Sequence, residues 1–297
     1  MLLGTRRASH AGARLCPSLC SKSKASMPLK SLIADQARWA NRRWPGHSGA
    51  RAPSLRANLF VRMSRDIQCQ FERGSGGELG TDRRPGKMSS LRSSSALSYN
   101  VFAPWLGHDL LPLARVLNTS LFDQTLQFER QFPHGLQSTP PNLDVVLDNQ
   151  QPRPLGIEGK FTEPYGAKAV HPPLDEKYFA DRRKRWAECG LSRCQDLAKS
   201  LGRGETFHRL GAGQLLKHIL GLAWTTNAQP RLMYLWFDTG CAEAAEHERE
   251  LERFRKLIDT SIAFSSLTYQ QLFRELRREQ EPVRGYHSYL GKRYFAA

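Results

Sequence analysis

The sequence predicts an α/β fold in which helices flank a central mixed sheet of about four strands, preceded by a basic N-terminal arm. Three observations support this. The 297 residues are 40% hydrophobic, enough for one large domain or two small ones with a buried core. Short apolar runs of strand length alternate with segments of helical periodicity. Residues 1–98 carry 18 basic and five acidic side chains, and so contribute most of the formal net charge of +16.

Residues 1–26 contain five basic and no acidic side chains, and they lack the apolar core of a secretory signal. Because nothing in them can join a hydrophobic core, we expect a disordered basic extension. A mitochondrial transit peptide has the same composition. An upstream extension in front of a start at Met27 is the interpretation we favour.

Residues 27–93 are expected to form a basic, loop-rich arm in front of a domain over residues 94–297. Apolar residues recur at helical spacing over residues 28–44, and Trp44-Pro45-Gly46 ends that helix. Residues 45–90 are rich in Gly, Ser, Arg and Pro, which favours extended loops. Basic loops suit a phosphate backbone, because binding releases counterions, although a solvated basic loop has the same composition.

The elements of the domain follow from the spacing of its apolar residues, since helices and strands differ in period. The expected helices, of which the third is a short amphipathic segment, cover residues 96–105, 110–117, 122–132, 213–224, 243–258 and 269–279. The expected strands cover residues 143–148, 155–161 and 231–237. Turn-forming residues 149–153 join the first two strands into a hairpin.

Several classes of protein are excluded by what the sequence lacks. A membrane span needs about 20 apolar residues, and the apolar stretch 214–224 is short and carries Lys217 and His218. The six cysteines show no paired CxxC spacing, so neither a zinc ribbon nor a disulfide scaffold is indicated, and a reducing cytoplasm fits best. The sequence also has no HExxH, GxSxG or Walker motif.

Candidate chemistry is concentrated in the hairpin. Side chains alternate along a strand, so Glu158 and Lys160 share one face, and Asp144 on the preceding strand can approach Glu158. Two adjacent carboxylates repel unless a cation lies between them, and Mg²⁺ accepts one or two carboxylates together with water and phosphate oxygens. Lys160 would then polarise an attacking water or stabilise charge on phosphate. The alternative is that these charged residues form an exposed cross-strand salt bridge. The apolar runs beside them on both strands disfavour it, because they indicate burial and a buried charge needs a partner.

This hairpin resembles the PD-(D/E)XK nuclease signature: Asn142-Leu143-Asp144, a 13-residue gap, and Glu158-Gly159-Lys160. Pro141 is separated from Asp144 by two residues, so the acid is matched and the strict PD dipeptide is not. The wider chain, roughly Met27 to Leu272, is similar to a bacterial group of restriction endonucleases in that superfamily. The likeness lies in Gly77-Glu78-Leu79-Gly80, Lys87-Met88, Ser93-Ser94-Ser95-Ala96-Leu97, Phe128-Glu129 and Tyr269-Gln270-Gln271-Leu272.

The resemblance implies a PD-(D/E)XK-type, restriction-endonuclease-like core and roles for residues of the hairpin. Asp144 and Glu158 would ligate the metal, the backbone carbonyl of Gly159 would complete the shell, and Lys160 would position the nucleophilic water. The cofactor would be Mg²⁺, with Mn²⁺ as the alternative.

Further residues are weaker candidates. Glu129 matches an acidic residue on the first core helix of many such folds, and Gln214 matches a glutamine on the helix after the core. The alternatives are that Glu129 is a solvated helix acid and that Gln214 is a surface residue. In the basic run Arg182-Arg183-Lys184-Arg185, guanidinium groups could fork onto phosphates, although a solvated helix face has the same pattern.

These patterns together predict a Mg²⁺-dependent DNA endonuclease, of restriction type by the resemblance. The competing hypotheses are a non-catalytic DNA-binding module with a degenerate nuclease-like fold, and an adaptor that binds a partner through its C-terminal helices. DNA is the expected partner and no membrane association is expected. The oligomeric state is left open, with a homodimer as one option.

Overall fold

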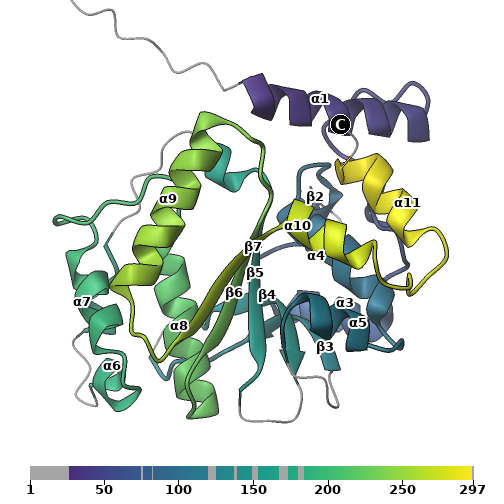
Figure 1. Cartoon of the computed structure of the whole chain (residues 1–297). Helices are drawn as coiled ribbons and strands as arrows, with labels where there is room; N and C mark the ends of the chain where they lie inside the picture. Colours follow the sequence, from purple (N-terminus) through teal and green to yellow (C-terminus); the bar gives the residue numbers. More distant parts are fainter. Residues whose placement is uncertain are drawn as a thin grey trace, which may run out of the picture.

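The computed structural model describes residues 27–74, 76–81, 83–119, 125–136, 139–148, 153–166, 173–179 and 184–295. The fold is mixed α/β, with helices on both faces of one central sheet (Figure 1). The predicted disordered extension over residues 1–26 lies outside the described residues. No helix in the described part of the chain is long and apolar enough to cross a membrane.

The central sheet has five strands, one more than the sequence predicts. These are β3 (Thr125–Gln131), β4 (Asn142–Asp148), β5 (Leu155–Lys160), β6 (Arg231–Trp236) and β7 (Ala263–Thr268), in that spatial order. β4 runs antiparallel to both β3 and β5, whereas β5, β6 and β7 run parallel, so the sheet is mixed. Parallel neighbours require crossover connections, and helices supply both of them.

One face of the sheet is covered by the green helices of Figure 1, with apolar side chains packed beneath them. These helices are α6 (Arg185–Glu188), α7 (Ser192–Ser200), α8 (Ala212–Thr226) and α9 (Ala242–Leu257). The sequence predicts α8 and α9 closely, because their apolar stripes face the sheet. Along β6, Leu232 and Tyr234 join this core while Met233 joins the opposite one, so the central strand is apolar throughout.

The opposite face carries a second core beneath helices from both ends of the chain. These helices are α3 (Arg65–Arg73), α4 (Ser94–Phe102), α5 (Leu111–Val116), α10 (Tyr269–Leu276) and α11 (Tyr286–Leu290). Short 3₁₀ turns span Lys87–Ser89, Ala103–Trp105, Glu163–Tyr165 and Glu176–Tyr178, and a π-helical turn spans Gly291–Phe295. The arm also contains α1 (Met27–Arg43), α2 (Leu55–Asn58) and the small antiparallel pair β1 (Gly80–Thr81) and β2 (Arg84–Pro85).

The N-terminal arm is tied to the C-terminal end of the chain through Arg293. This arginine is buried, with its guanidinium 4.4 Å from the ring centre of Trp39 on α1. It donates a hydrogen bond of 2.6 Å to the carbonyl of Asn58, and its own carbonyl accepts one from Gln36, also 2.6 Å. The division of the chain at residue 93 into arm and domain stays a prediction.

Two regions differ from the predicted secondary structure. Residues 45–90 are not only loops, because α3 forms there, capped by Ser64 and packed through Ile67 and Phe71. Residues 122–132 were predicted to be helical, yet β3 occupies 125–131. Leu126 and Phe128 are two residues apart and bury together, and pairing with β4 decides the strand over the helix.

Candidate active site

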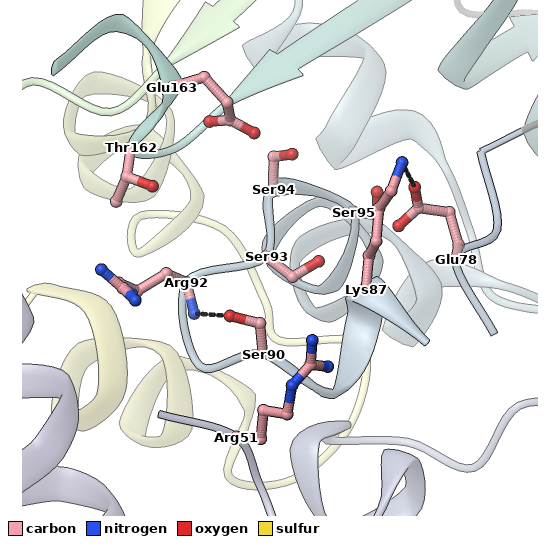
Figure 2. A pocket seen from close by; sticks show the side chains of 10 residues that line it. All are labelled: Arg51, Glu78, Lys87, Ser90, Arg92, Ser93, Ser94, Ser95, Thr162 and Glu163. Atoms are coloured by element: carbon pink, nitrogen blue, oxygen red, sulfur yellow. Dashed lines mark hydrogen bonds and ion pairs between the residues drawn. The ribbon is translucent and has the colours of Figure 1, made fainter. Parts of the chain in front are cut away.

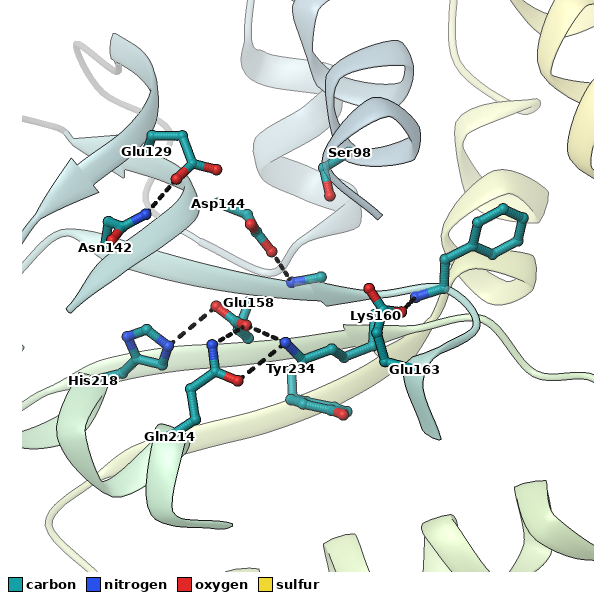
Figure 3. Close-up of polar contacts among 12 residues, drawn as sticks. Ser98, Glu129, Asn142, Asp144, Glu158, Lys160, Glu163, Gln214, His218 and Tyr234 are labelled. Carbon is teal, nitrogen blue, oxygen red and sulfur yellow. Dashed lines mark hydrogen bonds and ion pairs between the residues drawn. The ribbon is translucent and has the colours of Figure 1, made fainter. Parts of the chain in front are cut away.

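The candidate site lies where β4 and β5 separate. Their pairing runs from Leu147 opposite Leu155 to Val145 opposite Ile157, and the next residues along are Asp144 and Glu158. There the Oδ2 atom of Asp144 accepts a 2.6 Å hydrogen bond from the N–H of Gly159 (Figure 3). A side-chain carboxylate thus replaces the main-chain acceptor of a regular ladder. The carbonyl of Gly159 faces the same gap, because the N–H and C=O of one strand residue point to one edge.

Glu158 is the most heavily contacted acid in the site and is only 2% exposed. Its Oε1 atom accepts hydrogen bonds from Lys160 Nζ at 2.5 Å and from Gln214 Nε2 at 2.8 Å. Nε2 of His218 lies 3.2 Å from Oε2, and Gln214 accepts from Lys160 at 3.1 Å. The structure therefore brings Glu158, Lys160 and Gln214 together, as Figure 3 shows.

The two acids of the hairpin lie in different electrostatic environments. Burial opposes ionisation of Glu158, but Lys160 and His218 outweigh it and lower the pKa of Glu158 to about 2. Burial, followed by repulsion from Glu158 and Glu129, raises the pKa of Asp144 well above its usual range. Lys160 remains a cation, because the two acids raise its pKa against the effect of burial. A further cation would relieve the repulsion that Asp144 experiences.

Glu129 reaches the site from β3 rather than from a helix. Phe128 pairs with Val145 and Arg130 with Leu143, and Glu129 between them has a left-handed backbone with φ of 48°. Asn142 donates a hydrogen bond to its carboxylate. Burial, then repulsion from neighbouring carboxylates, raises the pKa of Glu129 to about 7. Its predicted place beside the hairpin is observed, whereas the predicted helix around it is wrong.

A cavity of about 390 Å³ connects these groups. Its charged and titratable lining residues are Glu78, Lys87, Glu129, Asp144, Glu158, Lys160, Lys217 and His218. Gly159 forms part of the wall, and a Cβ atom there would lie 2.5 Å from the hydroxyl of Ser98 and 2.6 Å from that of Tyr269. Only glycine fits between Glu158 and Lys160 at this close approach.

Among the cavity residues without a role in the sequence-based prediction are one acid and one histidine, both buried. Glu78 comes from the arm, is 8% exposed, and has Lys87 Nζ at 3.6 Å. His218 is buried on α8, one turn after Gln214. The i,i+4 spacing of Gln214 and His218 was a usable signal, because it places both on one helical face. Nothing local in the sequence joins Glu78 to β5.

A comparison with protein families decides the affiliation of the chain. The model of the family described as restriction endonuclease associating with ARP, REase-ARP, matches residues 30–295. The chain belongs to this family. The match extends from α1 to the π-helical turn at the C-terminus, so it covers the arm as well as the site. Searches of curated proteins and of solved structures gave no match.

Membership in REase-ARP indicates a nuclease role that involves DNA. The described residues of this REase-ARP protein contain no group of three or more His, Cys, Asp or Glu side chains arranged to hold a metal ion. The donors predicted from the sequence are instead two carboxylates, Asp144 and Glu158, and the Gly159 carbonyl, all of which belong to residues that line the cavity. Such a sparse oxygen set fits Mg²⁺, which keeps several of its waters, better than it fits Zn²⁺.

The basic run that sequence analysis proposes for DNA binding is only partly described. Arg182 and Arg183 lie outside the described residues. Lys184 is exposed just before α6, and the guanidinium of Arg185 stacks 5.0 Å from the ring centre of Trp224. DNA binding by this run of the REase-ARP chain stays a prediction.

Proposed function

We propose that this REase-ARP protein is a Mg²⁺-dependent endonuclease that hydrolyses DNA phosphodiester bonds at a PD-(D/E)XK-type site. The observation that carries the proposal is the meeting of Asp144, Glu158 and Lys160 at the opening between β4 and β5, where burial and the neighbouring carboxylates raise the pKa of Asp144. Perturbed acids that line a cavity are characteristic of functional sites.

Asp144 and Glu158 would hold Mg²⁺, or Mn²⁺ in its place, together with the carbonyl of Gly159. When bound, the metal would supply positive charge to the phosphate and to the attacking water. The hydrogen bond from Gly159 to Asp144 fixes one carboxylate at the gap. Gln214 donates to Glu158 and so orients the other.

Lys160 would supply the second positive charge. Its ammonium group is held between Glu158 and Gln214, and the adjacent acids keep it protonated. From this position it would orient a water molecule for attack and stabilise the negative charge that grows on the phosphate. Because Lys160 is already charged and lies beside Glu158, its positive charge is in place when the reaction begins.

Incubation with supercoiled plasmid tests the proposal. The parent protein is expected to nick or linearise the DNA with Mg²⁺ and to leave it intact with chelator, and Asp144→Asn is expected to be inactive under both conditions. A gel shift without Mg²⁺ measures binding separately. DNA that is bound in a salt-sensitive manner but never cleaved, with Mg²⁺ or Mn²⁺, would replace the proposal with a DNA-binding module whose nuclease-like fold is degenerate.

A further inference from the structure

A second hollow, of about 500 Å³, adjoins the cavity of about 390 Å³ at the candidate active site, which we call the acidic cavity (Figure 2). Its lining residues are Arg51, Glu78, Lys87, Ser90, Arg92, Ser93, Ser94, Ser95, Thr162 and Glu163. Four of these residues, namely Glu78, Lys87, Ser94 and Ser95, line the acidic cavity as well. The two hollows therefore share a wall, and a flexible polyanion could occupy both at once.

Two arginines, Arg51 and Arg92, line the second hollow and do not line the acidic cavity. Arg51 is oriented by hydrogen bonds from Nη1 to the carbonyl of Gly86, 2.9 Å, and to the hydroxyl of Ser89, 2.6 Å. Arg92 is exposed, and among the described residues its guanidinium has no polar partner. Figure 2 shows both arginines around the same hollow. Arg92 is therefore available to a ligand without loss of any contact within the protein.

The acids of the second hollow are already engaged. Glu78 has the ammonium of Lys87 at 3.6 Å, and Glu163 accepts a 2.7 Å hydrogen bond from the N–H of Phe161. In the acidic cavity, by contrast, Asp144 is repelled by two other carboxylates. One hollow thus favours a cation and its neighbour favours an anion.

The segment 87–90, which forms the rim between the two hollows, is held by a buried side chain. The side-chain amide of Asn58, which is fully buried, donates to the carbonyl of Met88 at 2.6 Å and to that of Ser90 at 3.0 Å. Arg293 in turn donates to the carbonyl of Asn58. Binding groups placed on a fixed rim lose little freedom when a ligand arrives.

We propose that the second hollow is a subsite for the DNA backbone phosphate next to the one that is cleaved. Arg92 and Arg51 would hold this phosphate, with the hydroxyls of Ser93 and Ser94 as further donors. The inference rests on the proposed endonuclease function, because the neighbouring phosphate is defined by the bond that is cut. It assigns the segments around Lys87 and Ser93, which the family resemblance singles out, to substrate positioning rather than to chemistry.

Binding is measured first, without cleavage. Fluorescence anisotropy of a short DNA duplex with Ca²⁺ in place of Mg²⁺ compares Arg92→Ala with Arg203→Ala, a matched control at an exposed arginine outside both hollows. Arg92→Ala is expected to weaken binding about 10- to 100-fold, the range for one charge-assisted hydrogen bond. It should also reduce the slope of log affinity against log salt by about one. Arg203→Ala should change neither quantity.

Cleavage then separates positioning from chemistry. Bis(p-nitrophenyl) phosphate has a single phosphodiester and no neighbouring phosphate, so Arg92→Ala should lower plasmid cleavage at least several-fold more than hydrolysis of this ester. Equal losses on both substrates would overturn the subsite, as would parental affinity and salt slope in Arg92→Ala. If the parent protein cleaves neither substrate, the endonuclease proposal fails, and the anisotropy measurement still decides whether Arg92 binds phosphate.

Discussion

Glu158 and Glu250 are both buried carboxylates on the α8 and α9 side of the sheet, but they are stabilised in different ways. Glu250 on α9 accepts hydrogen bonds from three consecutive backbone N–H groups, those of His208, Arg209 and Leu210, at 2.7 to 2.8 Å. Within the described part of the chain, the polar partners of the Glu158 carboxylate are side chains only, and Glu158 lines a cavity. The first charge is fixed by the backbone, and the second is fixed by groups that can move.

This difference distinguishes a structural charge from a candidate catalytic one. Backbone donors in a loop cannot be exchanged for a metal ion or a phosphate without unfolding that loop, so Glu250 stabilises the fold. Lys160 and Gln214 can rotate to new partners while Glu158 remains in place. The two acids are also connected, because the loop that Glu250 holds leads directly into α8, which carries Gln214.

The largest expected effect is on cleavage. Lys160→Ala and Glu158→Gln should each reduce the rate of plasmid cleavage about 100- to 1,000-fold, because each removes a charge aimed at the reacting phosphate or its metal. Initial rates under saturating Mg²⁺ measure this, and Glu248→Gln, an exposed acid on α9, serves as the control. A Lys160→Ala protein that cuts at the parental rate would show that Glu158 and Lys160 form only a salt bridge.

Glu250→Gln tests the structural half of the comparison. It replaces a charged acceptor of three backbone hydrogen bonds with a neutral amide, and should lower the free energy of unfolding by about 2–4 kcal/mol. Urea denaturation measures this, and Glu248→Gln should change stability by less than about 0.5 kcal/mol. Equal stability of the two variants would contradict a structural role for Glu250.

The pH dependence of stability provides a third test, through His247 on α9. Burial, then repulsion by Arg209 and Lys160, lowers the pKa of His247 to about 3. As pH falls from 7 to 5, the unfolded chain takes up a proton that folded His247 does not, so His247 by itself should lower the free energy of unfolding by about 2 kcal/mol. Glu129 acts in the opposite direction, because its folded pKa of about 7 lets the folded state take up a proton over the same range.

Glu158 adds little slope to stability in this pH range, because its folded pKa is about 2 and its ordinary value is 4.5, so it is mostly ionised in both states. Its contribution is lost only below that range. Urea denaturation at several pH values should therefore show that lowering the pH from 7 to 5 destabilises the parent relative to His247→Phe by about 2 kcal/mol. The same pH dependence in His247→Phe and in the parent would contradict this role of His247.

The smallest expected effect is stabilisation by metal. At millimolar Mg²⁺, several times a millimolar-range dissociation constant, binding should add about 1 kcal/mol to stability and raise the melting temperature by about 2–4 °C. The shift should persist in Glu250→Gln and disappear in Asp144→Asn. Because Asp144→Asn also removes repulsion from Glu158, its melting temperature without metal should exceed that of the parent.

The sequence by itself determined the hairpin and the charged pair on it. Turn-forming residues between two short apolar runs predict β4 and β5, and the period of two predicts that Glu158 and Lys160 share a face. Helices with clear apolar stripes, such as α8 and α9, were also predictable. These are local properties, because periodicity and turn chemistry act over only a few residues.

Only the tertiary structure decided which other groups join the hairpin. β7 was missed because Ser265 and Ser266 give this edge strand a weak apolar signal, and pairing with β6 forms it. Glu129 was assigned to a helix because its flanking apolar residues fit both periods until β4 paired with them. Glu78 and His218 reach the cavity from distant segments. Periodicity shows which face of an element is buried, but packing between distant segments decides what that face meets.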